Sequence, residues 1–180
     1  MQILSYVLGI LGLACSITAS LIKGKNMKAI LFFIFCGNVL VATSYLAGGS
    51  GINGAACCYL GGAQAIVNYL FESKDKPLPN WLVGIYAISI IALNLAVGGF
   101  SPLGILAIIA SLTFILCIGQ KNGAKYRFWT VVNMVLWCTY DVLSKSFGAL
   151  SSHIPLLLFT VAGMIIHDRK NKDSNASIGA

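Results

Sequence analysis

The sequence predicts an all-α membrane protein, in which seven transmembrane helices form two parallel three-helix repeats joined by a linking helix. Three observations lead to this prediction: seven long apolar runs, a one-sided distribution of cations, and an internal repeat. Of the 180 residues, 58% are hydrophobic and only 9% are charged, whereas soluble domains carry about 25% charged residues. A soluble fold of this size could not bury so much apolar surface, so we expect lipid to cover it.

The apolar runs define the expected spans. A helix needs about 20 apolar residues to cross a bilayer, with about 17 to 25 observed. Seven runs come close to that length, and the connections between them are short. The runs are 4–22, 29–47, 54–71, 82–97, 102–119, 128–144 and 150–166.

The cations test the number of spans independently. Alternating spans place the connections 23–28, 72–80 and 119–127 and the tail after residue 166 on one side of the membrane. Of the twelve lysines and arginines, only Lys145 falls on the other side. The remaining cations are Lys23, Lys25, Lys28, Lys74, Lys76, Lys121, Lys125, Arg127, Arg169, Lys170 and Lys172. Cytoplasmic connections are enriched in Lys and Arg, so the N-terminus is predicted outside and the C-terminus in the cytoplasm.

The third observation is an ungapped match of the chain to itself at an offset of 95 residues. LGIL at 8–11 recurs as LGIL at 103–106, and Asn38 meets Asn133. Positions 8–45 hold twelve identities in this register, where chance in so biased a composition would supply about three. We therefore predict that the chain contains two copies of one structural unit.

This repeat determines the expected domain organisation. A three-helix unit begins and ends on opposite sides of a membrane, so a second copy with the same orientation requires one linking helix. Parallel repeats of this kind are a known transporter design. The predicted units are a first repeat at 1–71, a cytoplasmic loop and linking helix at 72–101, a second repeat at 102–166 and a disordered cytoplasmic tail at 167–180.

Several function classes are excluded by what the sequence lacks. The cations form short clusters between apolar runs and no continuous basic face, so we expect no nucleic-acid partner. The spans contain no paired carboxylates, HExxH motif or nucleophile elbow, and the chain has no phosphate-binding loop, so we expect no enzyme. The six cysteines include no CxxC pair, and the two histidines lie far from any second ligand. No metal or cofactor is expected.

Polar side chains within the spans are the candidates for a solute site, because such groups usually face the bundle interior or a water-filled cavity. On the sixth run, Asn133, Trp137 and Tyr140 lie at i, i+4 and i+7 and share one face. The full candidate set lies on the second, third and sixth runs and comprises Asn38, Gln64, Asn68, Asn133, Trp137 and Tyr140. Its groups suit an uncharged, partly flat solute that forms hydrogen bonds.

Each of these residues also has a structural interpretation, which the sequence leaves open. Asn38 and Asn133 could form hydrogen bonds between helices rather than line a pocket. Tyr140 lies near the end of its span, where tyrosines commonly anchor a helix at the membrane interface. Asp141 is the carboxylate predicted inside a span; it could carry an ion or proton, or form an ion pair with Lys145 four residues later.

The 3+1+3 arrangement resembles that of the SWEET sugar facilitators and the PnuC vitamin transporters, which share an MtN3-like architecture. At sequence level the chain resembles the YgjV-type family of bacterial inner-membrane proteins, best from LGILAIIASLTFILC through FWTVVNMVLWCTY to GMIIHDRK. SWEET-like facilitators place an aromatic residue on the sixth span and an asparagine on the third, positions that Trp137 and Asn68 occupy here. These resemblances imply a multi-pass protein of the bacterial inner membrane.

The expected function is a small facilitator. It would move an uncharged polar metabolite, such as a sugar or a nucleoside-like vitamin, by alternating access between its two triple-helix units. The alternative is a receptor or scaffold that uses the same fold without transport. The lipid bilayer and a small-molecule solute are the expected partners, and the sequence leaves homo-oligomerisation open.

Overall fold

The computed structural model describes residues 2–22, 26–48, 52–98, 100–143 and 147–176. Within these residues the chain forms seven α-helices and no strand, which confirms the all-helical prediction. The helices are α1 Gln2–Leu21, α2 Met27–Gly48, α3 Ile52–Ser73, α4 Asn80–Gly98, α5 Pro102–Ile118, α6 Gly123–Leu143 and α7 Phe147–Ala176. Each predicted run falls on one helix.

Two of these helices are long and apolar enough to cross a membrane on length and composition: Ile3–Leu21 in α1 and Met27–Ser44 in α2. Three further apolar stretches are shorter, namely Asn80–Ala96, Pro102–Ile118 and Ser152–Ile166. The strongest hydropathy signal therefore lies in the first two helices.

Two helices extend at least five residues beyond the runs from which they were predicted. α6 begins at Gly123, so Lys125 and Arg127 are helical although hydropathy had placed them in a loop. Hydropathy marks only the apolar part of a helix, whereas helix formation is cooperative and continues into polar residues that suit it. For the same reason α7 continues through Ala176, where the sequence had predicted a disordered tail.

The start of α5 shows how local sequence sets a helix boundary. Ser101 precedes the helix with an extended backbone, and its Oγ accepts a hydrogen bond of 3.0 Å from the backbone N–H of Gly104. Pro102 occupies the first helical position, where its fixed φ is suitable and its missing N–H is no loss. A serine cap followed by proline is a strong helix start.

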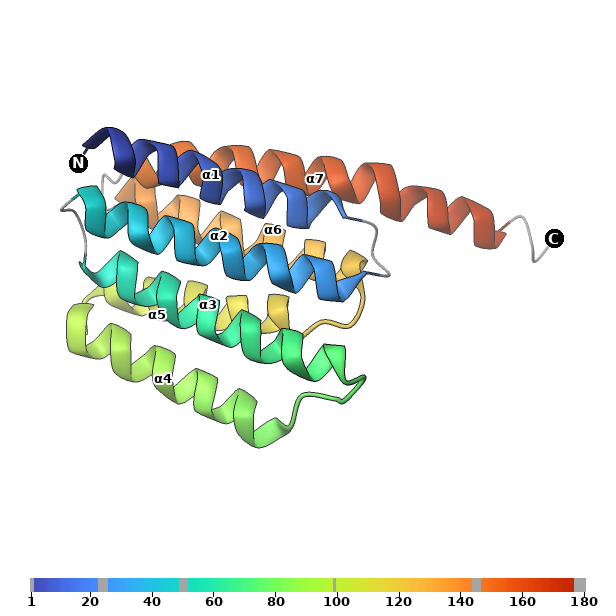
Figure 1. Ribbon diagram of the computed structural model, residues 1–180, viewed down its shortest axis with the longest axis horizontal. Helices are drawn as coiled ribbons and strands as arrows, with labels where there is room; N and C mark the ends of the chain where they lie inside the picture. Colours follow the sequence, from blue (N-terminus) through green and yellow to red (C-terminus); the bar gives the residue numbers. More distant parts are fainter. Residues whose placement is uncertain (1, 23–25, 49–51, 99, 144–146, 177–180) are drawn as a thin grey trace.

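Six of the helices form a closed ring in the order α1, α2, α3, α5, α6, α7, with α7 packing back against α1. α4 lies outside the ring, against α3 and α5 (Figure 1). Odd-numbered helices run in one direction and even-numbered helices in the other, so the two ends of the chain lie at opposite ends of the bundle (Figure 1). Exchanging α1, α2 and α3 for α5, α6 and α7 leaves the order of contacts in the ring unchanged.

The interior combines an apolar core with polar side chains. The apolar core near one end joins residues of α1, α2, α3, α5 and α6, including Ala19, Ile30, Ala65, Cys117 and Tyr126. Among the residues whose burial the structure describes, nine polar or charged ones are also buried: Ser20, Gln64, Asn68, Asn94, Ser111, Arg127, Thr130, Asn133 and Thr160. The described surface, by contrast, exposes large apolar side chains on every helix.

Candidate functional site

Asn68 lies where α3, α4 and α5 meet, and it links all three helices. Its Nδ2 donates a hydrogen bond of 2.8 Å to the backbone carbonyl of Ile118 at the end of α5. Its Oδ1 accepts a bond of 3.0 Å from the Tyr86 hydroxyl of α4. The sequence predicted Asn68 as a solute-binding residue, and the structure shows an amide that is bonded on both sides in this conformation.

Gln64 lies one turn before Asn68 on α3, and its side chain is only 1% exposed. Neither its Nε2 nor its Oε1 has a hydrogen-bond partner among the described residues. The Tyr86 hydroxyl approaches the backbone carbonyl of Gln64 at 3.4 Å and leaves the side-chain amide unbonded. Buried polar groups in native proteins are nearly always bonded, so an amide with two free atoms indicates a function or a missing partner.

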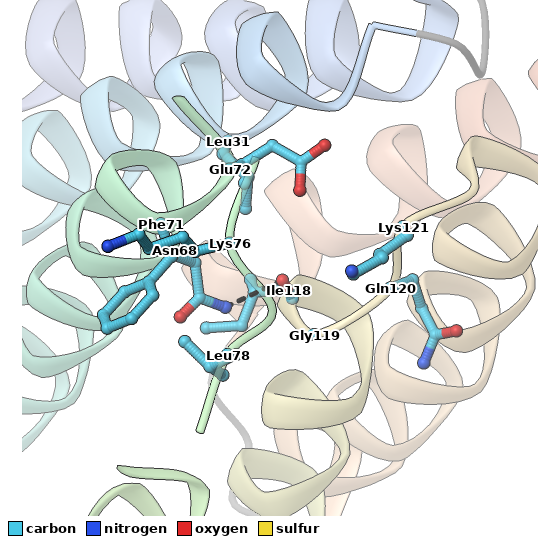
Figure 2. A pocket seen from close by; sticks show the side chains of 10 residues that line it. All are labelled: Leu31, Asn68, Phe71, Glu72, Lys76, Leu78, Ile118, Gly119, Gln120 and Lys121. Atoms are coloured by element: carbon cyan, nitrogen blue, oxygen red, sulfur yellow. Dashed lines mark hydrogen bonds between the residues drawn. The ribbon is translucent and has the colours of Figure 1, made fainter. Parts of the chain in front are cut away.

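A pocket of about 40 Å³ lies beside Asn68 at the end of the bundle. Figure 2 shows the Asn68 amide directed toward Ile118, with Lys121 on the opposite side of the opening. The loops after α3 and α5 supply the charged side chains of its rim, Lys76 and Lys121, and Glu72 comes from the last turn of α3. A cavity of this size holds about three water molecules and excludes a sugar-sized solute.

The paired asparagines of the two repeats donate hydrogen bonds to different partners. Asn133 is 2% exposed, and its Nδ2 donates to the backbone carbonyl of Ala110 and, at 2.8 Å, to Thr113 Oγ1, both on α5. Asn38 donates instead to the carbonyl of Ile34 in its own helix, at 2.9 Å. Asn133 thus links α6 to α5, which is what the structural interpretation of this residue predicts.

The aromatic candidates form a separate cluster near the other end of α6. The rings of Trp137 and Tyr140 meet edge to face with centroids 5.4 Å apart. Trp137 also stacks on His153 of α7, with ring centroids 6.0 Å apart. Trp137 is not among the residues that line the pocket beside Asn68. The structure therefore separates the predicted site into a cluster at α6–α7 and an amide pair, Gln64 and Asn68, at α3–α5.

Asp141 belongs to α6, but its side chain lies outside the described residues, as does Lys145. The predicted ion or proton role of Asp141 stays a prediction.

The two halves of the ring meet at α3–α5 and at α1–α7. The contact between α1 and α7 is closely packed. Ser20 Oγ and Thr160 Oγ1 lie 2.9 Å apart, and both residues are fully buried. A Cβ built on Gly163 would lie 2.6 Å from the carbonyl oxygen of Ser20, so the two backbones are in direct contact. The Arg127 guanidinium adds a bond of 2.9 Å from Nη1 to the carbonyl of Ile22.

Sequence reasoning missed three buried residues with polar side chains, namely Arg127, Tyr86 and Asn94. Arg127 counted only as a loop cation, yet it is 1% exposed within α6. Tyr86 and Asn94 lie on the linking helix, which carried no predicted site residue. Asn94 donates to the carbonyl of Ile90 in its own helix, at 2.9 Å. A polar residue inside an apolar run was the available signal for Asn94 and Tyr86.

No protein-family model, no curated protein and no solved structure matches this chain. The likeness to YgjV-type and SWEET-like proteins therefore stays a prediction from sequence, and the function has to be argued from the geometry alone.

Proposed function

We propose that all seven helices cross the bacterial inner membrane. We further propose that the protein transports a small uncharged polar solute across this membrane, along a path between its two triple-helix halves. The unbonded, buried amide of Gln64 is the observation that carries the transport proposal. The membrane proposal rests on the surface.

The described surface of the bundle is unusually apolar for a protein in water, and polar side chains are buried beside the apolar core. Large apolar side chains such as Ile10, Ile88 and Leu158 are about two-thirds exposed, whereas Gln64 and Asn133 are buried. Soluble proteins rarely expose large contiguous apolar patches. Only 17% of the apolar window Ile3–Leu21 is buried within the bundle, whereas a core helix of a soluble protein would be mostly covered. Lipid is the solvent that suits this surface.

The helix lengths are compatible with this proposal, including those of the shorter helices. α5 has 17 residues, which at 1.5 Å per residue gives a length of about 26 Å. The hydrocarbon core of a bilayer is about 30 Å thick, and local thinning accommodates a mismatch of a few ångströms. The other helices have at least 19 residues each.

The ring supports two structurally related halves. The starts of α2 and α3, at Met27 and Ile52, correspond under the 95-residue offset to positions 122 and 147, and α6 and α7 start at Gly123 and Phe147. The contact of α1 with α7 corresponds under the same exchange to that of α5 with α3. Two similar units that face each other across an interior with some buried polar side chains suit a mechanism in which one unit rocks against the other.

Gln64 supplies the reason to expect a solute. An amide without partners in an apolar environment costs several kcal/mol, and no water from a lipid phase reaches it. A solute that offers one donor and one acceptor would satisfy both amide atoms. The buried residues one turn before and after Gln64 on α3, Gly61 and Asn68, carry no charge, so the site favours an uncharged solute.

Flux measurements on the purified protein in liposomes, with a panel of uncharged sugars, nucleosides and amides, test the proposal. The decisive variant is Gln64→Leu. Removing an unbonded buried amide should raise stability by about 1 to 3 kcal/mol and abolish flux. Thr18→Val is the matched control, because Thr18 is exposed and bonds within its own helix; it should change neither quantity. Loss of stability in Gln64→Leu with unchanged flux would contradict the proposal.

The competing function is a receptor or scaffold without transport. It predicts solute binding to the detergent-purified protein that depends on Gln64, with no flux in liposomes under any gradient. Measuring binding and flux on the same preparation separates the two functions.

A further inference from the structure

The two halves of the ring meet at two seams, one between α1 and α7 and one between α3 and α5. The 95-residue offset relates these seams position by position. Thr160 on α7 corresponds to Ala65 on α3, and Gly163 corresponds to Asn68. Two seams that occupy equivalent places therefore differ in their side chains, and this difference indicates which of them can open.

The α1–α7 seam has the chemistry of a fixed contact. Ser20 and Thr160 bond each other at 2.9 Å without access to solvent. At Gly163 the backbones approach so closely that a methyl group would overlap the Ser20 carbonyl. Arg127 adds a charged bond to the carbonyl of Ile22, so α6 is tied to the end of α1 as well. No space for a solute is left at Gly163.

The α3–α5 seam is held more weakly at the matching positions. Ala65 replaces the threonine and offers no hydrogen bond, although it is fully buried. Asn68 replaces the glycine and bridges to Ile118 with one bond of 2.8 Å. Gln64 lies one turn deeper and is unbonded. The pocket beside Asn68 gives this seam, at its end, an opening from the bundle surface (Figure 2).

We propose that the α1–α7 seam is a permanent hinge, that the α3–α5 seam opens during transport, and that the opened seam binds the solute at Gln64. This inference rests on the proposed function. Opening breaks the bond from Asn68 Nδ2 to the Ile118 carbonyl and exposes the Gln64 amide to a solute. The solute class is an uncharged molecule with an adjacent donor and acceptor, such as a carboxamide or a pair of neighbouring hydroxyls. The Gln64 amide matches such a solute because its NH₂ group donates hydrogen bonds and its carbonyl oxygen accepts them.

α4 has a defined part in this arrangement. It packs against both helices of the opening seam, and its Tyr86 hydroxyl bonds Asn68 from the side. α4 therefore covers the outside of the seam, and the solute reaches Gln64 from the end of the bundle rather than from the lipid.

Thiol labelling at matched buried positions tests which seam opens. In a background without native cysteines, Ala65→Cys and Thr160→Cys place one thiol in each seam, both at fully buried positions. A membrane-impermeant thiol reagent, applied from both sides of reconstituted vesicles, should modify the thiol at position 65 at least tenfold faster than that at position 160. Equal rates, or a faster reaction at position 160, would overturn the assignment.

Hydrogen exchange gives a second readout on the unmodified protein, in case the cysteine-free background fails to fold. The segments Gly61–Asn68 of α3 and Leu156–Gly163 of α7 correspond under the offset, so they form a matched pair. The backbone amides of the α3 segment should exchange faster. Slower exchange in α3 than in α7 would contradict an opening α3–α5 seam.

These outcomes are separable from those of the flux assay. Flux together with faster labelling at position 160 would keep the transport function and remove the seam assignment. Faster labelling at position 65 without flux of any solute would keep the opening seam and remove transport.

Discussion

Replacing Gly163 with alanine tests the closeness of the α1–α7 seam directly. The added Cβ would lie 2.6 Å from the Ser20 carbonyl oxygen and 3.2 Å from Arg127 Cδ. A side-chain atom could rotate away, but a helical carbonyl oxygen cannot, so α1 and α7 must separate by roughly 0.5 Å or more to restore normal contact distances. Overpacking of this kind costs about 1 to 3 kcal/mol. We therefore expect Gly163→Ala to lower the free energy of unfolding by that amount.

Two other glycines complete a graded series. At Gly61 an added Cβ would lie 3.0 Å from Asn38 Oδ1 and 3.2 Å from the Phe114 ring, which are side-chain atoms that can move, so a smaller loss is expected. At Gly84 nothing lies within 4 Å, and alanine should be neutral or stabilise by about 0.5 to 1 kcal/mol. Thermal unfolding in one detergent should rank the melting temperatures Gly163→Ala lowest and Gly84→Ala highest. A Gly163→Ala protein as stable as the wild type would refute the close seam.

Three further predictions address topology and the remaining contacts. Single cysteines at Phe100 and Lys121 should react with an impermeant reagent from opposite sides of the membrane; labelling of both from one side would contradict the seven-span proposal. Asn133→Leu should lose about 0.6 to 2 kcal/mol of stability through its bonds to α5, with solute affinity unchanged; loss of affinity without loss of stability would restore its pocket role. Lys28→Ala removes an exposed ion pair of 3.7 Å with Asp75 and should leave the melting temperature unchanged, whereas a clear drop would show that this loop contact matters.

The helices were predictable because their signal is local. Each apolar run fell on a helix, and the 95-residue repeat anticipated the matching starts of α3 and α7, at Ile52 and Phe147. Helix ends were less predictable. Arg127 belongs to the first turns of α6 and is buried there by contacts with α1 and α7, and these helices lie far away in the sequence. A basic residue beside an apolar run gives the same sequence pattern whether its side chain faces water or the protein core.

The sequence predicted which residues belong to the candidate site, but it did not predict which groups each of them contacts. Polar side chains inside apolar runs identified Gln64, Asn68 and Asn133 from the sequence alone. The partners that distinguish them are backbone carbonyls, which have no sequence signature: Asn133 meets Ala110, whereas Gln64 meets nothing. Trp137 was placed in the same pocket on helical periodicity, which gives the face of a helix but not the neighbour that covers it.

The closed ring also constrains how the protein is assembled. Ser20 and Thr160 are 140 residues apart in the chain, so the seam that they form joins α1 to a helix that is synthesised much later. Contacts of such high sequence separation form late. Until α7 is inserted, the face of α1 that carries Ser20 lacks the helix that packs against it in the finished ring, while α2 already packs against another face of α1. A nascent chain that stops before Phe147 is therefore an open arc, and α7 completes the ring.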